Sequence, residues 1–542
     1  MTVYWVVFDA AAHWVVDRLE REGSLPAVSR LRRGGRMTAA RPARPNCQTP
    51  PSLATLFTGT WASEHGVTGY SVPGAGQGIG SHVSGFSPGY PAVSPIWQTA
   101  AERDLTSAFV HVPWVFGSTS RVEPAVEGAI EAYSRRVVRH GILRLPLPAQ
   151  EGAPWRIGPF TVEVTGPVGG GSVRVRTAHG QVTLAARGAW RPLALDDRHG
   201  TWLGLTGSGD DMTLVHTGVW EPRVDGSSTD LVKALEACPP FAGEGVGPLY
   251  RRGVFGPRLV DGGDGTAEDV FLASLRCVAE SFGACATAVL ARHSADLVVV
   301  YLPLTDDIGH EMLGWCDERS GAHRPDMADA VWDRIRQCYG WADDVLGEVI
   351  DRAGEEDTVV LGADHGMVGS THLVHVNQAL LDAGLAVLTG HDAIDSVRSR
   401  AFYHPANNGS LWAGARSASD RDEATALRQA MDVIAGITEP ATGQPLLRGF
   451  QDSHGRGISR DQVTCGPLFV CFADDYQPSS VLDPGGAVVC ATPKSGAHVV
   501  NTGDPRLHAI HAALGPGIPA GSDPGVLDNT APAALVARQL GF

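Results

Sequence analysis

The sequence predicts an α/β fold in which helices flank a mostly parallel central sheet and a β-rich insertion interrupts the chain. The first observation is a set of short apolar runs rich in Val, at residues 3–8, 297–301 and 358–361, as is typical of buried parallel strands. The second is the amphipathic stretch that follows or precedes each run, which predicts a helix. The third is a change of pattern between about 150 and 220, where apolar and polar residues alternate between Gly-rich turns.

The first 60 residues predict one strand and two helices. The apolar run at 3–8 ends at Asp9, and the amphipathic stretch after it stops at Gly34-Gly35. Thr49 precedes two prolines and the apolar residues 53–57, a pattern typical of a helix start. Taken alone, this pattern predicts that Thr49 caps the helix with its hydroxyl.

Further along, we expect the insertion and then a second part of the core. Short strands are predicted at 160–164, 172–176, 181–184 and 212–215. A long helix is predicted from Thr266, with Asp269 completing a box-like cap, and another at 327–352. The predicted organisation is a first core segment at 1–125, an insertion at 126–258 that caps the active site and selects the substrate, and a second core segment at 259–542.

Composition restricts the partners and the cell compartment. The 43 basic and 59 acidic residues give a net charge of −16, which argues against a nucleic-acid polymer or an anionic membrane as partner. No apolar run approaches the roughly 20 residues of a membrane span, and the first residues lack the basic start of a signal peptide. The nine cysteines form no CxxC pair, so a reduced, cytoplasmic location is expected. No pattern indicates an oligomeric state.

Chemically active side chains follow several of the predicted strands. Asp9 follows the first, the pair Asp306 and His310 follows the second, and Asp364-His365 follows the third. His498 comes after the apolar run at 487–490. Ligands of open α/β sheets bind at the carboxyl ends of the strands, so these side chains could converge. Such a set of carboxylates and imidazoles, with the Thr49 hydroxyl, can hold two divalent metal ions, and the Asp/His mixture favours Zn²⁺.

Each of these residues also has a structural explanation when it is taken singly. Asp306 and His310 are spaced as neighbours on one helix face, and Asp364-His365-Gly366 is compatible with a strand-exit turn. A lone histidine such as His498 is usually structural, and His454 is a rival for the last ligand. Their joint occurrence favours the metal site.

In order along the chain, these motifs resemble the alkaline phosphatase superfamily, in its branch of type I phosphodiesterases and nucleotide pyrophosphatases. The resemblance lies in Phe8-Asp9, in Thr49-Pro50-Pro51 with the later Thr58-Gly59 and His65-Gly66, and in three further elements: Asp306-Asp-Ile-Gly-His310, Asp364-His-Gly-Met367, and His498 followed by Gly515-Pro-Gly-Ile518. It covers roughly residues 1–75 and 295–520.

The resemblance implies an alkaline-phosphatase-like core and a hydrolase that acts on small-molecule phosphate esters, nucleotide-like ones included. It implies that Thr49 is the nucleophile and forms a phosphothreonine, which water then hydrolyses. One metal would be bound by Asp306, His310 and His498. The other would be bound by Asp9, Thr49, Asp364 and His365.

The chain departs from the family pattern near the nucleophile. An Asn that contacts a phosphate oxygen in nucleotide pyrophosphatases has no counterpart in residues 67–70, and the Asn three residues after the nucleophile is Ser52. The leaving group therefore stays open between phosphodiesters, phosphomonoesters and phosphonates. A sulfatase is rejected because residues 47–51 lack the Cys/Ser-x-Pro-x-Arg pattern, and the intact ligand set argues against a non-catalytic binding module.

The residues around Thr49 favour diesters. No Lys or Arg occurs between Arg44 and Arg103, whereas a monoester dianion needs cationic or donor groups besides the metals. Tyr70 would suit an organic substituent. A distant Arg could still reach the site, with Arg44, Arg456 and Arg506 as the candidates, and His111 and Trp114 could line the substrate side.

Overall fold

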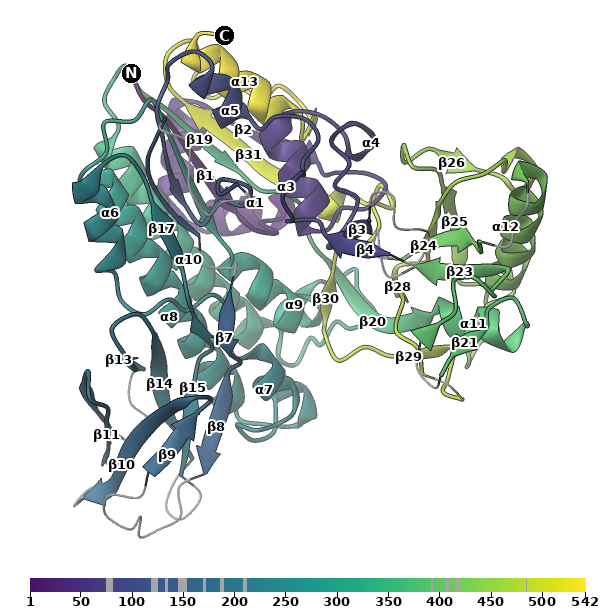
Figure 1. Cartoon of the computed structure of the whole chain (residues 1–542), viewed down its shortest axis with the longest axis horizontal. Coiled ribbons are helices and arrows are strands. Elements are labelled where there is room, and N and C mark those ends of the chain that lie inside the picture. The colour runs from purple at the N-terminus through teal and green to yellow at the C-terminus, as the bar shows by residue number, and fades with distance from the viewer. Residues whose placement is uncertain are drawn as a thin grey trace.

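A nine-stranded central sheet organises the computed structural model, which describes residues 1–74, 81–117, 125–131, 135–144, 154–168, 172–185, 190–207, 212–390, 393–404, 409–415, 419–483 and 485–542. The strand order is β17-β6-β5-β18-β1-β19-β31-β2-β32. Figure 1 shows this sheet between helices, with two β-rich parts projecting from the core. The predicted fold class, an α/β core of the alkaline-phosphatase type with a mostly parallel sheet and added β structure, is confirmed.

The parallel strands lie in the middle of the sheet. β1 (Val3–Phe8) pairs in parallel with β18 (Leu297–Leu302) on one side and with β19 (Thr358–Gly362) on the other. Every residue of these three strands is buried, which explains their continuous apolar sequences. The other members of the sheet are the parallel strands β5 (Ser107–Val110), β6 (Val126–Glu131) and β32 (Leu527–Asp528), and β17 (Arg223–Asp225), β31 (Ala509–Leu514) and β2 (Arg36–Arg41) with antiparallel partners.

Helices cover the sheet and carry part of the site. The core helices are α1 (His13–Arg21), α2 (Pro26–Gly34), α3 (Thr49–Thr58), α4 (Ala62–His65), α5 (Ile96–Ala101), α8 (Thr266–Leu290), α9 (Leu304–Cys316), α10 (Ala328–Arg352) and α13 (Ala531–Leu540). α10 packs against both α8 and α9. The predicted cap of α8 is wrong, because its N-cap is Gly265 in the left-handed conformation and no side chain caps it.

α8 is also the one helix in the described residues that is long and apolar enough to cross a membrane. Its most apolar part is 61% buried. The core helix of a globular protein meets the same criterion of length and composition.

The insertion forms two small sheets with their own core. One contains β9 (Pro154–Ile157), β10 (Phe160–Val168), β11 (Ser172–Arg176) and β12 (Gln181–Leu184), and the other contains β8 (Gly141–Arg144), β13 (Arg191–Ala194), β14 (Gly200–Thr206) and β15 (Thr213–His216). A short ladder joins β7 (Arg136–Val138) to β16 (Val219–Trp220), and the helices α6 (Thr229–Glu236) and α7 (Gly247–Arg251) follow. Trp190, Trp202 and Trp220 belong to the main core, so the insertion is anchored on it by large aromatic side chains.

A second projecting lobe lies on the right of Figure 1. It contains β23 (Ala401–His404), β24 (Ser410–Ala413), β25 (Leu447–Gln451), β26 (Gly457–Ile458) and β27 (Leu468–Phe472) in one sheet, with α11 (Val376–Asp382) and α12 (Asp420–Ala435). Its apolar residues form a separate cluster that includes Tyr403, Leu427 and Val470. This lobe lies within the predicted second core segment, 259–542, and has its own apolar cluster.

The lobe is joined to the core by a group of strands beside the site. β20 (Val368–His375) pairs with β28 (Asp475–Ser479), β29 (Val489–Ala491) and β30 (Gly496–Ala497). Smaller hairpins are formed by β3 (Ser71–Pro73) with β4 (His82–Ser84), and by β21 (Leu388–Thr389) with β22 (Ala393–Ile394).

Because β1 is parallel to both β18 and β19, the carboxyl ends of these three strands share one edge of the central sheet. Ligands of such sheets bind at this edge.

Candidate active site

Asp9 is fixed where β1 leaves the sheet. Its backbone N–H donates to the carbonyl of Leu302 at 2.9 Å, and the hydroxyl of Thr305 donates to its carbonyl. The hydroxyl of Tyr301 donates to one carboxylate oxygen, Oδ2. The side chain is therefore held from β18 and α9 while its second oxygen, Oδ1, points into the site.

Asp364 and His365 follow β19. Asp364 Oδ1 accepts hydrogen bonds from the backbone N–H groups of Ala10 and His365, both at 3.0 Å. His365 Nδ1 lies 3.0 Å from the carbonyl of Gly366, so with a proton on Nδ1 the ring would offer the Nε2 lone pair to a cation. Nε2 lies 3.2 Å from Asp364 Oδ2 and 3.4 Å from Asp9 Oδ1.

The second group comes from α9 and from the segment after β30. His310 Nδ1 lies 2.8 Å from the carbonyl of Gly496, which again leaves Nε2 unprotonated. This nitrogen is 3.5 Å from Asp306 Oδ1 and 3.1 Å from His498 Nε2. His498 Nε2 is 3.2 Å from the same Asp306 oxygen. Three ligand atoms therefore point at one small volume.

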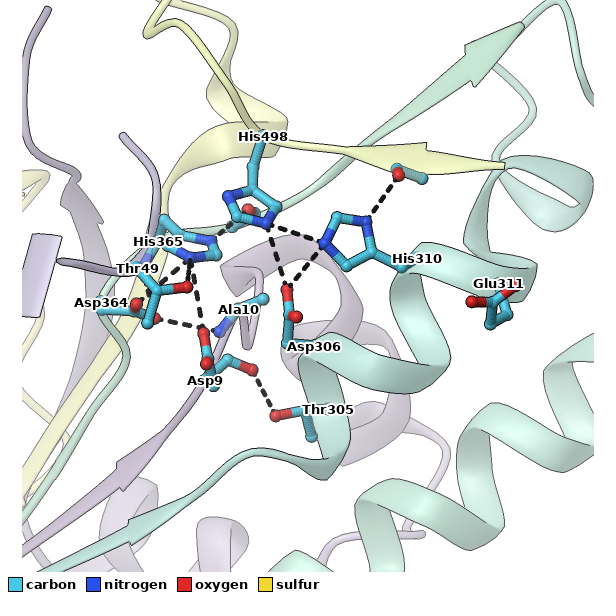
Figure 2. A network of polar contacts seen from close by, with 12 residues as sticks. Asp9, Ala10, Thr49, Thr305, Asp306, His310, Glu311, Asp364, His365 and His498 are labelled. Atoms are coloured by element: carbon cyan, nitrogen blue, oxygen red, sulfur yellow. Dashed lines mark hydrogen bonds and ion pairs between the residues drawn. The ribbon is translucent and has the colours of Figure 1, made fainter. Parts of the chain in front are cut away.

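The two groups are adjacent, as Figure 2 shows. The rings of His365 and His498 stack with centroids 3.8 Å apart and an interplanar angle of 15°. Within each group, Asp9–Asp364–His365 and Asp306–His310–His498, the ligand atoms all lie within 4.8 Å of one another. These are the two sets into which the resemblance divides the metal ligands, apart from Thr49.

Unsatisfied acceptors test whether cations fit this site. Asp9 Oδ1, Asp306 Oδ1 and Asp364 Oδ2 are buried and accept no hydrogen bond. A buried charged oxygen without a partner is costly, and no Lys or Arg forms an ion pair with these carboxylates in the described part of the chain. Two divalent cations would satisfy all three oxygens at once, so the donor set fits them.

The electrostatics of the site agree with this fit. Burial, then Asp364 and Asp306, raise the pKa of Asp9 well above its usual value. Burial opposes ionisation of Asp306 too, but His310 and His498 lower its pKa overall. Burial lowers the pKa of His310 to about 3, so this imidazole is neutral, as a metal ligand must be.

Thr49 is the first residue of α3, and its hydroxyl faces the site. The N-cap of α3 is Gln48, and no side chain caps the helix, so the expectation that Thr49 caps it is wrong. Instead Thr49 Oγ1 lies 3.3 Å from His365 Nε2 and accepts a hydrogen bond from the Tyr70 hydroxyl at 3.1 Å. The helix start places the hydroxyl beside the Asp9–Asp364–His365 group.

A cleft of about 580 Å³ opens from Thr49, Asp9 and Asp306. Aromatic side chains form much of its wall: Tyr70, Phe86, Trp114 and Phe116. The rings of Phe86 and Trp114 lie 5.4 Å apart, and those of Tyr70 and Phe86 lie 6.3 Å apart. Tyr70 and Phe86 are 46% and 39% exposed, so their ring faces are available to a ligand.

The loop after β5 contributes the other side of the cleft. His111 and Trp114 both line it, and both have a positive φ, of 58° and 64°, which is strained for residues with a side chain. His111 is buried between Phe241 and Phe282, and its ring nitrogens have no hydrogen-bond partner. Burial lowers its pKa to about 3, so it enters the cleft as a neutral ring.

The basic residues considered from the sequence lie elsewhere. Arg44 stacks on Trp61, and Arg456 pairs with Asp452. Arg506 forms a buried ion pair with Asp317 and Asp504. Among the described residues that line the cleft, the one basic side chain is Arg223, from the base of the insertion, 5.9 Å from the Phe116 ring.

Sequence reasoning missed the side chains that hold the ligands in place. Asn529 donates to the carbonyls of Ala363 and Asp364 at 2.9 and 2.8 Å. Tyr301 ends the predicted strand 297–301 and donates its hydroxyl to Asp9. The signal for Tyr301 was present, since a polar hydroxyl at the end of a buried strand requires a partner. The rival His454 is exposed and lies outside both ligand groups.

Known proteins resemble this chain in sequence and in fold. The sequence model for type I phosphodiesterase / nucleotide pyrophosphatase matches residues 5–445. Phosphonoacetate hydrolase from Sinorhizobium meliloti 1021, solved with phosphonoacetate, is 13% identical with a TM-score of 0.50, over 100% of this chain and 96% of that chain. Human ectonucleotide pyrophosphatase / phosphodiesterase 5 is 12% identical with a TM-score of 0.49, over 100% and 95%.

No curated protein sequence matches the chain significantly. At 13% identity, the likeness to the phosphonoacetate hydrolase concerns the fold. The family match covers most of the sequence, from β1 into the first part of the lobe. The chain therefore belongs to the type I phosphodiesterase / nucleotide pyrophosphatase family of the alkaline phosphatase superfamily, and it is a hydrolase of that superfamily.

Proposed function

We propose that this chain is a two-metal phosphodiesterase that uses Thr49 as its nucleophile. One observation carries the proposal: the Thr49 hydroxyl lies 3.3 Å from His365 Nε2, at the edge of two adjoining groups of buried metal-type ligands. The family supports the coarser assignment to phosphodiesterases, pyrophosphatases or phosphonate hydrolases. The finer assignment, to diesters and to a covalent mechanism, is our proposal.

The ligand groups suit two divalent cations, for which the Asp/His mixture favours Zn²⁺. Asp306, His310 and His498 would hold one, and Asp9, Asp364 and His365 with Thr49 would hold the other. When bound, such a pair of cations lowers the pKa of a coordinated hydroxyl and stabilises negative charge on a phosphoryl group.

Thr49 then performs a two-step displacement. Its Oγ1 gives the hydroxyl proton to solvent and bonds to phosphorus, while the bond to the leaving oxygen breaks and that oxygen takes up a proton from solvent. A water oxygen next loses one proton and bonds to phosphorus, the Oγ1–phosphorus bond of the phosphothreonine breaks, and Oγ1 takes up a proton again. The position of Thr49 at the first turn of α3 supports this role, because a helix N-terminus favours an anion beside it.

The wall of the cleft supports a diester as substrate. A diester carries a second organic substituent and one charge fewer than a monoester. The exposed rings of Tyr70 and Phe86 offer that substituent an apolar surface. Arg223 is the one basic residue lining the cleft in the described part of the chain. The second negative charge of a monoester would therefore find little positive charge in the cleft wall to stabilise it.

Substitution of Thr49 tests the covalent mechanism. We expect Thr49→Ala to fold and to lose several orders of magnitude in kcat, as removal of a nucleophile does. Thr58→Ala, at the other end of α3, is the matched control because the Thr58 hydroxyl bonds only within its own turn and to Thr60, and it should keep its activity. Acid quenching and mass spectrometry of the wild type should locate a phosphoryl group on Thr49, and near-normal turnover by Thr49→Ala would exclude the mechanism.

Matched substrates test the diester preference. With p-nitrophenyl mono- and diesters and a phosphonate ester, we expect kcat/KM to favour a diester by about tenfold or more, or about 1.4 kcal/mol in the transition state. A clear preference for the monoester would move the assignment to a phosphatase, and a preference for the phosphonate would move it to a phosphonate hydrolase on the same ligands.

A further inference from the structure

Tyr70 contacts the hydroxyl of the proposed nucleophile, as His365 does. The Tyr70 hydroxyl donates to Thr49 Oγ1 at 3.1 Å, although the residue as a whole is 46% exposed. Tyr70 and Thr49 both line the cleft. A hydroxyl donor therefore lies beside the position that a phosphoryl group attacked by Thr49 must occupy.

The start of α3 offers few other hydrogen-bond donors to a phosphoryl group. A helix N-terminus ordinarily offers several free backbone N–H groups to an anion. Here Pro50 and Pro51 have no N–H, and the N–H of Ser52 already donates to the carbonyl of Gln48 at 3.0 Å. Of the first four residues of α3, Thr49 alone can offer its N–H to a phosphoryl oxygen. A side-chain donor beside the start of α3 is therefore needed to bind the other phosphoryl oxygens.

The loop that carries Tyr70 is held firmly. Gly85 N–H donates to the carbonyl of Tyr70 at 2.9 Å, and Asn46 Nδ2 donates to the carbonyl of Thr68 at 3.1 Å. Val67 N–H donates to His65 Nδ1 at 3.1 Å. A donor fixed before the reaction stabilises developing charge without a cost of reorganisation.

We propose that Tyr70 is a catalytic residue whose hydroxyl donates to a non-bridging phosphoryl oxygen in the transition state. The inference rests on the proposed function, since it takes Thr49 as the nucleophile. Once Oγ1 bonds to phosphorus it is a weaker acceptor than the charged oxygens beside it. Rotation of the phenolic O–H then transfers the hydrogen bond to one of them, and no proton leaves Tyr70.

Tyr70→Phe tests this role because it removes the hydroxyl and keeps the ring against Phe86. We expect kcat to fall by about 10²-fold, as when one donor to a developing oxyanion is removed, with KM changed little and the same metal content. Tyr90→Phe is the matched control. The Tyr90 hydroxyl donates to the carbonyl of Pro73 at 3.3 Å, outside the cleft lining, so this variant should keep wild-type kcat.

Phosphorothioate diesters identify the oxygen that Tyr70 contacts. Sulfur accepts hydrogen bonds poorly, so one diastereomer should react slowly with the wild type and lose that penalty, by most of the same factor, in Tyr70→Phe. Wild-type kcat in Tyr70→Phe, or a slow variant with unchanged penalties for both diastereomers, would overturn the inference. Neither result bears on the role of Thr49 as the nucleophile, because that role is tested separately and is excluded only if Thr49→Ala stays active.

Discussion

Asp9 and Asp364 each have one carboxylate oxygen that accepts hydrogen bonds from the protein and one that accepts none. Asp9 Oδ2 accepts from Tyr301 and Asp364 Oδ1 accepts two backbone N–H groups, while the remaining oxygens accept none. The histidines repeat the scheme, since His310 and His365 each have Nδ1 beside a backbone carbonyl and Nε2 toward the site. In the proposed metal site this division would orient each ligand in advance and so raise metal affinity.

The ligand assignment of the last histidine can be tested directly. We expect His498→Ala to lose the metal of the Asp306–His310–His498 group, so that elemental analysis finds about one divalent ion per chain in place of two. His454→Ala is the control, because His454 is exposed and belongs to neither group, and it should keep both ions. Two ions in His498→Ala, or one in His454→Ala, would contradict the assignment.

At the scale of elements, the site follows from three strands whose ends share one edge of the sheet. Their continuous apolar sequences predicted the strands, and the carboxylates within four residues of each strand end, Asp9, Asp306 and Asp364, were the predicted ligands. The lobe at 374–472 was harder to predict, because its strands and helices alternate much as those of the core do. Tyr70 was expected beside an organic substituent, but its hydrogen bond to Thr49 and the contacts of Asn529 with Ala363 and Asp364 depend on tertiary packing that the sequence pattern does not show.

The insertion approaches the cleft only at its base in the described residues. Of the range 126–258, the residues that line the cleft are Glu131, Arg223, Gly243 and Glu244. We therefore expect substrate selection by this region to act through β6, β17 and the loop before α7, and not through the two small sheets.

Arg223 tests that expectation. Arg223→Ala should raise KM several-fold for diesters with an anionic substituent and change KM little for neutral ones, because the guanidinium next to Phe116 is removed from the cleft wall. Arg191→Ala is the control: Arg191 is an exposed residue of β13 that is absent from the cleft lining. Equal KM values for Arg223→Ala and the wild type on both substrate types would show that the base of the insertion does not select the substituent.

At the scale of the whole molecule, the main core buries histidines that have no part in the ligand groups. Burial lowers the pKa of His65 to about 4 and that of His111 to about 3. Burial, together with Arg36, lowers the pKa of His511 to about 3. Arg36 lies 3.2 Å from His511 Nε2, so it donates to the neutral imidazole and would repel a protonated one.

These histidines give folding stability a predictable dependence on pH. In the unfolded chain a histidine titrates near 6.5, whereas in the folded protein these three stay neutral to about pH 4 or below. Below about pH 6.5 the unfolded chain therefore binds protons that the folded chain does not, and stability falls as pH falls, by up to about 1.4 kcal/mol per pH unit for each histidine. Above about pH 7 the contribution is constant.

A variant isolates one histidine from the many other groups that titrate in this range. The free energy of unfolding in urea, measured with a chelator at pH 7.5 and 5.5, should fall less in His511→Gln than in the wild type, by about 1.4 kcal/mol over this interval. His454→Gln is the control for the replacement of a histidine on the surface, and this variant should lose as much stability between the two pH values as the wild type. If His511→Gln and the wild type lose the same stability between the two pH values, then His511 takes up its proton in the folded protein too, and Arg36 must move away from it.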